Sequence, residues 1–347
     1  MIARVAVDSE ALLEHKEETR HAMNTQRTLV EMIQRFGLLE LLGDEDKDAF
    51  FDALNQLSPT LQDVWAKALV ALHGLNRVRA GGAASTVRDL VANVDLPVEL
   101  QALADLIVIR EAVATTRGVP LEAGYGGIDP EFVLADSLLH CTTVKQLSDA
   151  RERGNFPKGS DRSKVWEDVF AVPASLSTEV TLLEHHFLNH ALLKKGTWRD
   201  HLEWLVGQLD RSLSPGSTLR LLAELPEIGK PPQRTSMSPA DAERVIRHRL
   251  EPLLGSGSLA RVEVILAPWP GKLEERPHNR HLRFSCGVAI STHEGFDHLS
   301  NSTIEGLEGF TWQAHTAADF LAELSGREQV IRTRPGRLEI VIEGGRS

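Results

Sequence analysis

Cysteine is scarce in this sequence, and long apolar runs are missing. Only Cys141 and Cys286 occur among 347 residues. Two cysteines are too few for a disulfide framework, so we expect a reducing, cytoplasmic location. No segment reaches the roughly 20 apolar residues that span a bilayer. Residues 1–18 turn acidic before any apolar run of signal-peptide length, so we expect neither a secretion signal nor a membrane span.

Positive charge is also in the minority. The chain has 38 Lys and Arg residues against 49 Asp and Glu residues, which gives a formal net charge of -11. This balance argues against a protein that binds nucleic acid through its overall charge, but it leaves room for a local basic cleft. One basic stretch near the C-terminus either lines such a cleft or is simply solvated. It consists of Arg327, Arg332, Arg334 and Arg337.

The N-terminal third carries the apolar spacing of helices. Apolar residues recur with a period of three to four, and charged residues fill the positions between them. The predicted helices cover residues 9–42 and 43–54, a segment beginning at Pro59 with Ser58 as its cap, and residues 85–94. We therefore predict an all-helical module over residues 1–95. Its expected role is packing, oligomerisation or binding of a partner protein.

Beyond residue 95, strands alternate with helices. Strands are predicted over residues 104–113 (where a helix is the alternative), 179–183, 216–225 and 260–269, a hairpin over 281–292 and a last strand over 337–344, with helices over 197–213 and 238–254. This alternation predicts a mainly parallel or mixed sheet covered by helices, and so a layered α/β domain over residues 96–347. The chain as a whole then belongs to the α+β or α/β class.

One segment, residues 278–302, carries most of the functional signal. On a strand, His278 and Arg280 share a face because the side-chain period is two, while His281 and Arg283 point the other way. An imidazole beside a guanidinium suits phosphate chemistry: the histidine attacks phosphorus or moves a proton, and the arginine neutralises oxygens. A carboxylate, that of Asp297 or Glu184, could orient the imidazole.

A second segment is expected to meet this one. Glu184 and His185 follow the predicted strand 179–183, and ligands of such sheets bind beyond the carboxyl ends of the strands. We therefore expect Glu184 and His185 to converge with the His278 segment at one edge of the sheet. The candidate site residues are His278, Arg280, Asp297, Glu184 and His185.

The motifs of this region resemble those of the phospholipase D superfamily. The likeness is greatest to the phospholipase-D-like domain at the C-terminus of MIT-domain proteins, and it covers residues of about 100–347. Three short segments carry it: His278-Asn279-Arg280, Cys286-Gly287 and Gly295-Phe296-Asp297. The order of a helix, a strand, a second helix and a strand over residues 197–269 is also similar. The resemblance implies a phospholipase-D-like α/β fold.

The departures from that family concern activity. Active members have His-x-Lys with an Asp five residues after the Lys, whereas Arg280 replaces the Lys here and Ser285 stands at the Asp position. The family needs two histidines and this chain has one such motif, so a homodimer or a second histidine, His185 or His186, must complete the site. Arg and Lys are not interchangeable in a tight site. The resemblance thus implies a protein that has lost hydrolysis, binds a phosphate-bearing or protein ligand and works within a complex, as in bacterial phage-defence systems.

Two other functions stay open. One is an active phosphodiesterase or nuclease that uses His278 and Arg280, and the other is a scaffold that acts through the N-terminal module. Histidines are numerous, but no HExxH or CxxC spacing is present, so we predict neither a metal nor a cofactor. For His278 and Arg280, a structural role and a ligand-binding role are about equally expected.

Overall fold

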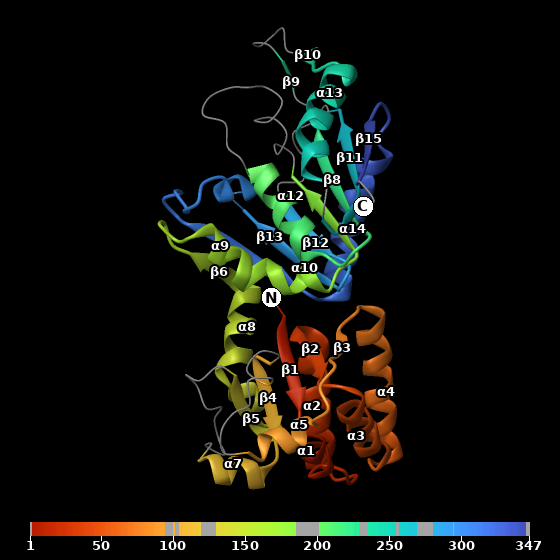
Figure 1. Cartoon of the computed structure of the whole chain (residues 1–347), viewed down its shortest axis with the longest axis vertical. Helices are drawn as coiled ribbons and strands as arrows, with labels where there is room; N and C mark the ends of the chain where they lie inside the picture. Colours follow the sequence, from red (N-terminus) through yellow and green to blue (C-terminus); the bar gives the residue numbers. More distant parts are fainter. Residues whose placement is uncertain are drawn as a thin grey trace. The chain divides into compact units, whose positions relative to one another are not determined.

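The structure is a computed structural model that describes residues 2–93, 100, 104–118, 130–184, 201–225, 227–228, 235–254, 257–268, 280–293 and 295–344. The chain divides into two compact units, an N-terminal unit, Ile2–Asp149, and a C-terminal unit, Ala150–Ser347. Figure 1 labels the elements of both units. The boundary expected after residue 95 falls inside the N-terminal unit.

A parallel sheet forms the centre of the N-terminal unit. Its strands are β1 (Ala3–Val7), β2 (Gly37–Leu41), β3 (Val78–Ala80), β4 (Leu106–Ile109) and β5 (Glu131–Leu134). They lie in the order β3-β2-β1-β4-β5, and every neighbouring pair is parallel. The prediction of an all-helical module over residues 1–95 is therefore wrong, because three of these strands fall within it.

The composition of the central strands explains their position. Strand β4 has the sequence LIVI, and all four side chains are buried; β2 has the sequence GLLEL and is buried throughout. Parallel strands covered on both faces are continuous apolar runs rather than alternating ones. Such short runs have no period of two, and the run after Gly37 therefore looked like the end of the preceding helix.

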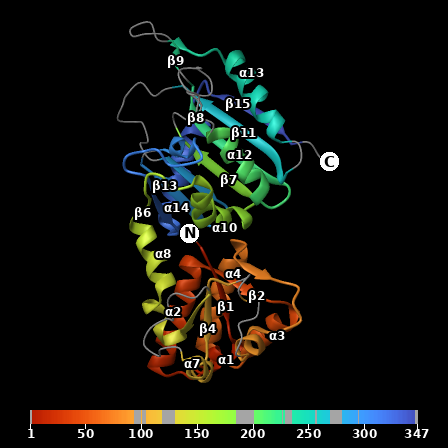
Figure 2. The ribbon, with the colours of Figure 1, turned by 60° about the vertical axis from the view of Figure 1, so that its left-hand side comes forward.

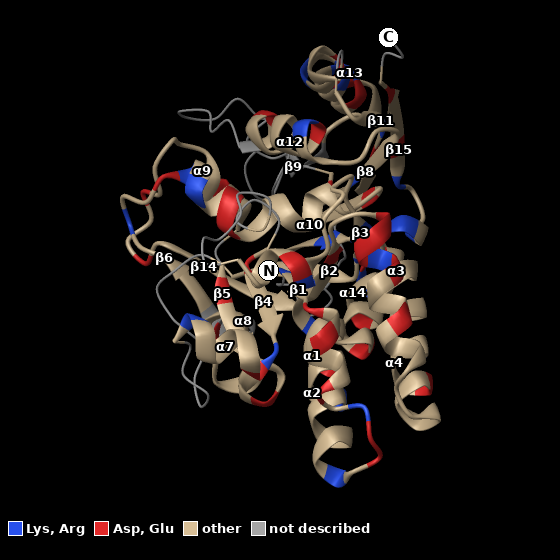
Figure 3. Cartoon of the chain, turned by 60° about the horizontal axis from the view of Figure 1, so that its bottom comes forward, with Lys and Arg blue, Asp and Glu red and all other residues tan. Residues whose placement is uncertain are grey.

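Helices connect these strands, as parallel pairing requires. The helices between the strands are α1 (Ser9–Leu13), α2 (Arg20–Phe36), α3 (Asp44–Asn55), α4 (Pro59–Gly74), α5 (Val87–Val91) and α7 (Glu111–Arg117). The 3-10 helix η1 (Ala135–His140) and α8 (Thr142–Arg153) follow β5. Helix α2 packs against β2, α4 and η1, and α5 packs against β1. The predicted start of α4 at Pro59 after Ser58 is confirmed. Figure 3 shows the acidic residues of α3, which cluster in its first turn.

The C-terminal unit is built on a mixed sheet, which confirms that part of the prediction. Its strands are β6 (Gly154–Phe156), β7 (Glu179–Leu183), β8 (Ser217–Glu224), β11 (Leu259–Ala267), β12 (Arg280–Phe284), β13 (Val288–Thr292), β14 (Phe310–His315) and β15 (Leu338–Glu343). The order is β15-β11-β8-β7-β12-β13-β14-β6. Strands β7, β8 and β11 are mutually parallel, and the remaining pairs are antiparallel. A separate small pair joins β9 (Glu227–Ile228) to β10 (Thr235–Ser236).

Helices accompany this sheet, as Figures 1 and 2 show. They are α9 (Arg162–Val165), the π-helical turn η2 (Trp166–Phe170), α10 (Ala171–Ser175), α12 (His201–Ser212), α13 (Pro239–Leu250), the 3-10 helices η3 (Glu251–Leu253) and η5 (Phe296–Leu299), and α14 (Ala318–Thr333). Helix α14 packs against β8 and β11, where Leu222, Ile265 and Ile331 share a buried cluster. The predicted Ser238 cap of α13 is confirmed, since its side chain accepts the N–H of Asp241.

Within the part of the chain that the structure describes, no helix combines the length and the apolar composition that crossing a bilayer requires.

Candidate functional site

Three chain segments meet at one edge of the C-terminal sheet. Strand β7 ends at Leu183, and Glu184 follows it directly. Strand β12 runs antiparallel to β7, with His281 opposite Leu183, so its first residue, Arg280, lies beside Glu184. Strand β13 ends opposite Arg280, and the chain then passes through Gly295 into η5, which carries Asp297. We call Glu184, Arg280 and Asp297 the sheet-edge site.

Direct contacts join the members of this site. The Nε atom of Arg280 lies 3.6 Å from Oε1 of Glu184, and its Nη1 donates to the backbone oxygen of His293 at 2.7 Å. Two of the five hydrogen-bond donors of the guanidinium belong to Nη2, which forms no hydrogen bond with any described residue. A ligand that approaches this edge can therefore still use Nη2.

Gly295 marks the point around which the three side chains gather. Its φ of 109° lies where residues with a side chain are strained. A Cβ atom at this position would lie 2.6 Å from Oδ1 of Asp297, 3.0 Å from Oε1 of Glu184 and 3.3 Å from Cδ of Arg280. Both carboxyl groups and the arginine stem thus approach the same small space, which only glycine leaves open.

The environment of Glu184 favours its neutral form. Its side chain is buried, with 2% of the residue exposed. Burial raises the pKa of Glu184 to about 8, the charge of Asp297 raises it as well, and Arg280 and the backbone N–H of Phe296 oppose the shift. Its Oε2 atom has no hydrogen-bond partner among the described residues. Near pH 7, Glu184 is therefore mostly a carboxylic acid that can donate its proton.

The structure bears on the five candidate residues unequally. It brings Glu184, Arg280 and Asp297 together at the edge where the sequence analysis expected a convergence. His278 and His185 lie outside the described residues, and the roles assigned to them stay predictions. The sequence predicted Asp297 as a group that orients an imidazole. It did not predict that Asp297 would lie beside the Glu184 carboxyl group.

The opposite face of β12 serves a different purpose. His281 is fully buried, and its Nε2 lies 3.0 Å from Oε1 of Glu328 in α14. Arg283 donates to the same carboxylate from Nε at 2.7 Å. Burial alone raises the pKa of Glu328, but the hydrogen bonds from Arg283 and His281 outweigh it and leave that pKa below its ordinary value. This ion-pair triad ties β12 to α14 and confirms that His281 and Arg283 share a face.

The basic stretch near the C-terminus is largely engaged in local contacts. Arg327 pairs with Glu323 at 2.6 Å, Arg337 donates to Glu339 at 2.5 Å, and Arg334 donates to the backbone oxygen of Pro268 at 3.0 Å. These contacts favour a solvated, salt-bridged surface over a phosphate cleft.

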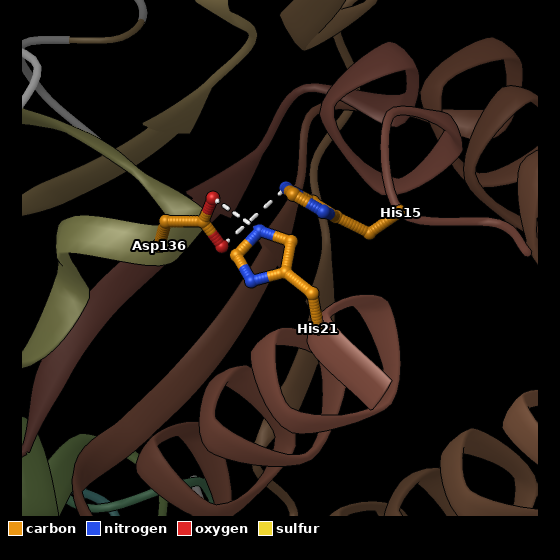
Figure 4. Close-up of side chains that lie close together, drawn as sticks. All are labelled: His15, His21 and Asp136. Atoms are coloured by element: carbon orange, nitrogen blue, oxygen red, sulfur yellow. Dashed lines mark hydrogen bonds and ion pairs between the residues drawn. The ribbon is translucent and has the colours of Figure 1, made fainter. Parts of the chain in front are cut away.

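Sequence analysis missed a second polar edge, which lies in the N-terminal unit. The strand order places a topological switch point between β1 and β4, where ligands of parallel sheets bind. Asp8 follows β1 and is fully buried; burial raises its pKa, and the N–H of Glu10 and the charge of Arg110 oppose this. At the same edge, His15, His21 and Asp136 form a cluster (Figure 4). Its members lie up to 121 positions apart in the chain, and the only local signal was a pair of histidines six residues apart.

Comparison with known proteins adds no constraint. The sequence matches no protein-family model and shows no significant similarity to a curated protein.

Proposed function

We propose that the C-terminal unit binds a phosphate-bearing ligand at the sheet-edge site and does not hydrolyse it. The observation that carries the proposal is the pairing of the Arg280 guanidinium with a buried glutamic acid whose pKa is about 8. Because Glu184 is mostly neutral near pH 7, Asp297 is the one carboxyl group of the sheet-edge site whose charge opposes that of Arg280. The acid proton and the Nη2 donors can together serve the oxygens of a phosphate group.

The position of Ser285 supports a role without hydrolysis. Active members of the phospholipase D superfamily have an Asp at this position. Here the Ser285 hydroxyl accepts the backbone N–H groups of Thr178 and Glu179 at 3.1 and 3.2 Å. These contacts lie at the far end of β12 from Arg280, about 15 Å away at the usual rise of a strand. Ser285 thus closes the hairpin and supplies no carboxylate at the position that is acidic in active members.

Binding of the purified protein to pyrophosphate and to a short fluorescent oligonucleotide, measured at about pH 7, tests the proposal. Arg280→Ala is expected to weaken binding at least tenfold, as loss of a charge-assisted contact does. Arg244→Ala is the matched control, because Arg244 is exposed on α13 and pairs only with Asp241 among the described residues. Equal affinities of the two variants, or no binding by the unaltered protein, would contradict the proposal.

Proton linkage gives the binding experiment a second readout. An anion near Glu184 favours its protonated form, so affinity should fall as the pH rises through about 8. Between about pH 7 and pH 9 the loss should approach tenfold. Glu184→Gln keeps a neutral side chain of the same shape and should remove most of this pH dependence. An unchanged pH profile in Glu184→Gln would assign the dependence to another group.

Phosphodiester hydrolysis is the second candidate function. It is favoured by the near-neutral pKa of Glu184, which suits an acid that transfers a proton in each turnover. Bis(p-nitrophenyl) phosphate distinguishes the two functions. The leading proposal predicts no hydrolysis above background, whereas hydrolysis that His278→Ala abolishes would establish an active phosphodiesterase.

The proposal includes a phospholipase-D-like fold for the C-terminal unit and a protein partner or a second copy of the chain. A setting in bacterial phage defence follows from the family resemblance alone. Light scattering of the purified protein tests self-association directly, and a monomer at micromolar concentration would leave a different protein as the required partner.

A further inference from the structure

The N-terminal unit holds a three-residue cluster with the composition of a metal site. Figure 4 shows both imidazole rings directed at the carboxylate of Asp136. The Nε2 atom of His21 lies 3.0 Å from Oδ2 of Asp136, and Nε2 of His15 lies 3.7 Å from Oδ1. One donor atom from each residue lies within 4.8 Å of the other two. From this geometry we propose that His15, His21 and Asp136 bind a divalent transition-metal ion of the Zn²⁺ type.

The spacing of the donor atoms fits such an ion. Zn²⁺ binds imidazole nitrogen and carboxylate oxygen at about 2.0–2.2 Å, so the ligand atoms of a tetrahedral site lie about 3.3 Å apart. The His21 separation of 3.0 Å is to Oδ2 of Asp136 and the His15 separation of 3.7 Å is to Oδ1, so a shared ion requires the carboxylate to turn one oxygen toward both rings. The rings meet edge to face, with centroids 5.6 Å apart and planes at 70°. Small side-chain rotations therefore suffice to admit the ion.

The fold places the three metal-binding residues at the edge of the sheet where parallel α/β sheets bind ligands. His15 lies just after α1, His21 is in the first turn of α2, and Asp136 is in η1, which follows β5. All three elements lie at the carboxyl edge of the parallel sheet. The hydroxyl of Thr25, one turn along α2 from His21, donates a short hydrogen bond to Oδ1 of Asp136. This contact orients the carboxylate, as outer partners of metal ligands do.

The exposure and the chemical type of the three ligands indicate which metal ions fit the site. The His15 side chain is 14% exposed, so the protein shields this ligand from bulk water. Two imidazoles and one carboxylate suit Zn²⁺, Co²⁺ or Ni²⁺ better than Mg²⁺ or Ca²⁺, which prefer oxygen ligands. The His21 side chain is 71% exposed, so solvent reaches the cluster. Three protein ligands and an accessible position for water are the pattern of a zinc site that is open to a further ligand.

The alternative is a hydrogen-bonded histidine and aspartate cluster that binds no metal. Titration of the metal-free protein with Co²⁺ and Zn²⁺ alone separates the two, with the visible absorption of tetrahedral Co²⁺ and isothermal calorimetry as readouts. The metal site predicts one ion in this unit at micromolar affinity and a tetrahedral Co²⁺ spectrum that Zn²⁺ displaces. Absence of that spectrum at metal concentrations on the order of 100 μM would overturn the proposal.

Variants assign the signal to this cluster, because the chain has 14 histidines and an exposed imidazole can bind metal ions weakly. His21→Ala and Asp136→Asn should each weaken binding at least tenfold. Thr25→Val, which alters only the positioning contact, should weaken it about tenfold with the Co²⁺ spectrum retained. His73→Ala, an exposed histidine of α4, is the control and should bind as the unaltered protein does. His21 is mostly exposed, so His21→Ala should keep its fold by circular dichroism. Equal binding by His21→Ala and His73→Ala would place the ion elsewhere.

Discussion

Two buried glutamates lie on opposite sides of strand β12, and their pKa values are shifted in opposite directions. Glu328 faces two hydrogen-bond donors, from Arg283 and His281, and its pKa is lowered despite burial. Glu184 meets one arginine at 3.6 Å and has Asp297 nearby, and its pKa is raised to about 8. Burial alone thus does not decide whether a carboxyl group is a structural anion or a proton-holding acid. The number of close donors and the sign of the neighbouring charges decide it.

The largest effect on stability is expected from removal of Glu328, the glutamate with a structural role. Glu328→Ala removes the acceptor of two donors and leaves a buried imidazole and a partly buried guanidinium without it. Loss of one partner from a buried ion pair typically lowers the free energy of unfolding by about 3–5 kcal/mol. Urea unfolding measures it, and Glu323→Ala on the exposed side of α14 should change it by about 0.5 kcal/mol or less. A similar small change in both variants would contradict a structural role for the triad.

The contributions of the two glutamates to the free energy of unfolding change with pH in opposite directions. The folded pKa of Glu184 is about 8, above the ordinary value of 4.5, so its contribution to stability is present at low pH and is lost as the pH rises toward 8. Relative to Glu184→Gln, the unaltered protein should lose on the order of 3 kcal/mol between about pH 5 and pH 8. The folded pKa of Glu328 lies below the ordinary value of 4.5. Its contribution to stability is therefore present at neutral pH and is lost as the pH falls below 4.5 and through the folded pKa. The difference in urea midpoint between the unaltered protein and Glu184→Gln should therefore change between about pH 5 and pH 8, and the difference for Glu328→Gln should change with the opposite sign below about pH 4.5.

Gly295→Ala should have an intermediate effect. The positive φ and the short approach to Asp297 and Glu184 together predict a loss of about 2 kcal/mol in the free energy of unfolding. The same change should weaken ligand binding at the sheet-edge site. Gly326→Ala in α14 is the matched control, because its Cβ would meet open space and alanine favours helix, so it should stabilise by about 0.5–1 kcal/mol. Thermal unfolding of the two variants should shift in opposite directions.

Ser285→Ala should have the smallest effect of the series. It removes the acceptor of the Thr178 and Glu179 backbone N–H groups, which are exposed enough for water to replace it. We expect a loss of about 1 kcal/mol or less. Affinity for pyrophosphate should not change. A large loss of ligand binding in Ser285→Ala would mean that this position does act on the site, as in active phospholipase D enzymes.

Much of the C-terminal unit could be predicted from the sequence, because its elements carry clear local signals. The alternation of strands and helices, the Ser238 cap and the hairpin of β12 and β13 were confirmed. Strand ends that share an edge also gave the convergence of Glu184 with Arg280, since the argument needs only the direction of strands.

The N-terminal unit was harder to predict, for physical reasons. Its strands are only three to five residues long, and β4 is apolar throughout, so neither a period of two nor a helical period distinguishes them. The pairing of β1 with β2 joins residues 34 positions apart and its pairing with β4 joins residues 101 positions apart, and no local pattern encodes either. The His15, His21 and Asp136 cluster depends on that pairing and was invisible for the same reason. The opposite pKa shifts of Glu184 and Glu328 likewise depend on side-chain distances that only a structure supplies.

Direct titration of the Glu184 carboxyl group tests the central claim most closely. Carbon-13 NMR or infrared difference spectra, with Glu184→Gln as the reference, report its protonation in the full-length protein. We predict a protonated acid at about pH 6 that ionises with a midpoint near 8 and that gains proton affinity when pyrophosphate binds. A carboxylate already ionised at about pH 6 would contradict the account, because Glu184 would then neutralise Arg280 and repel the proposed ligand.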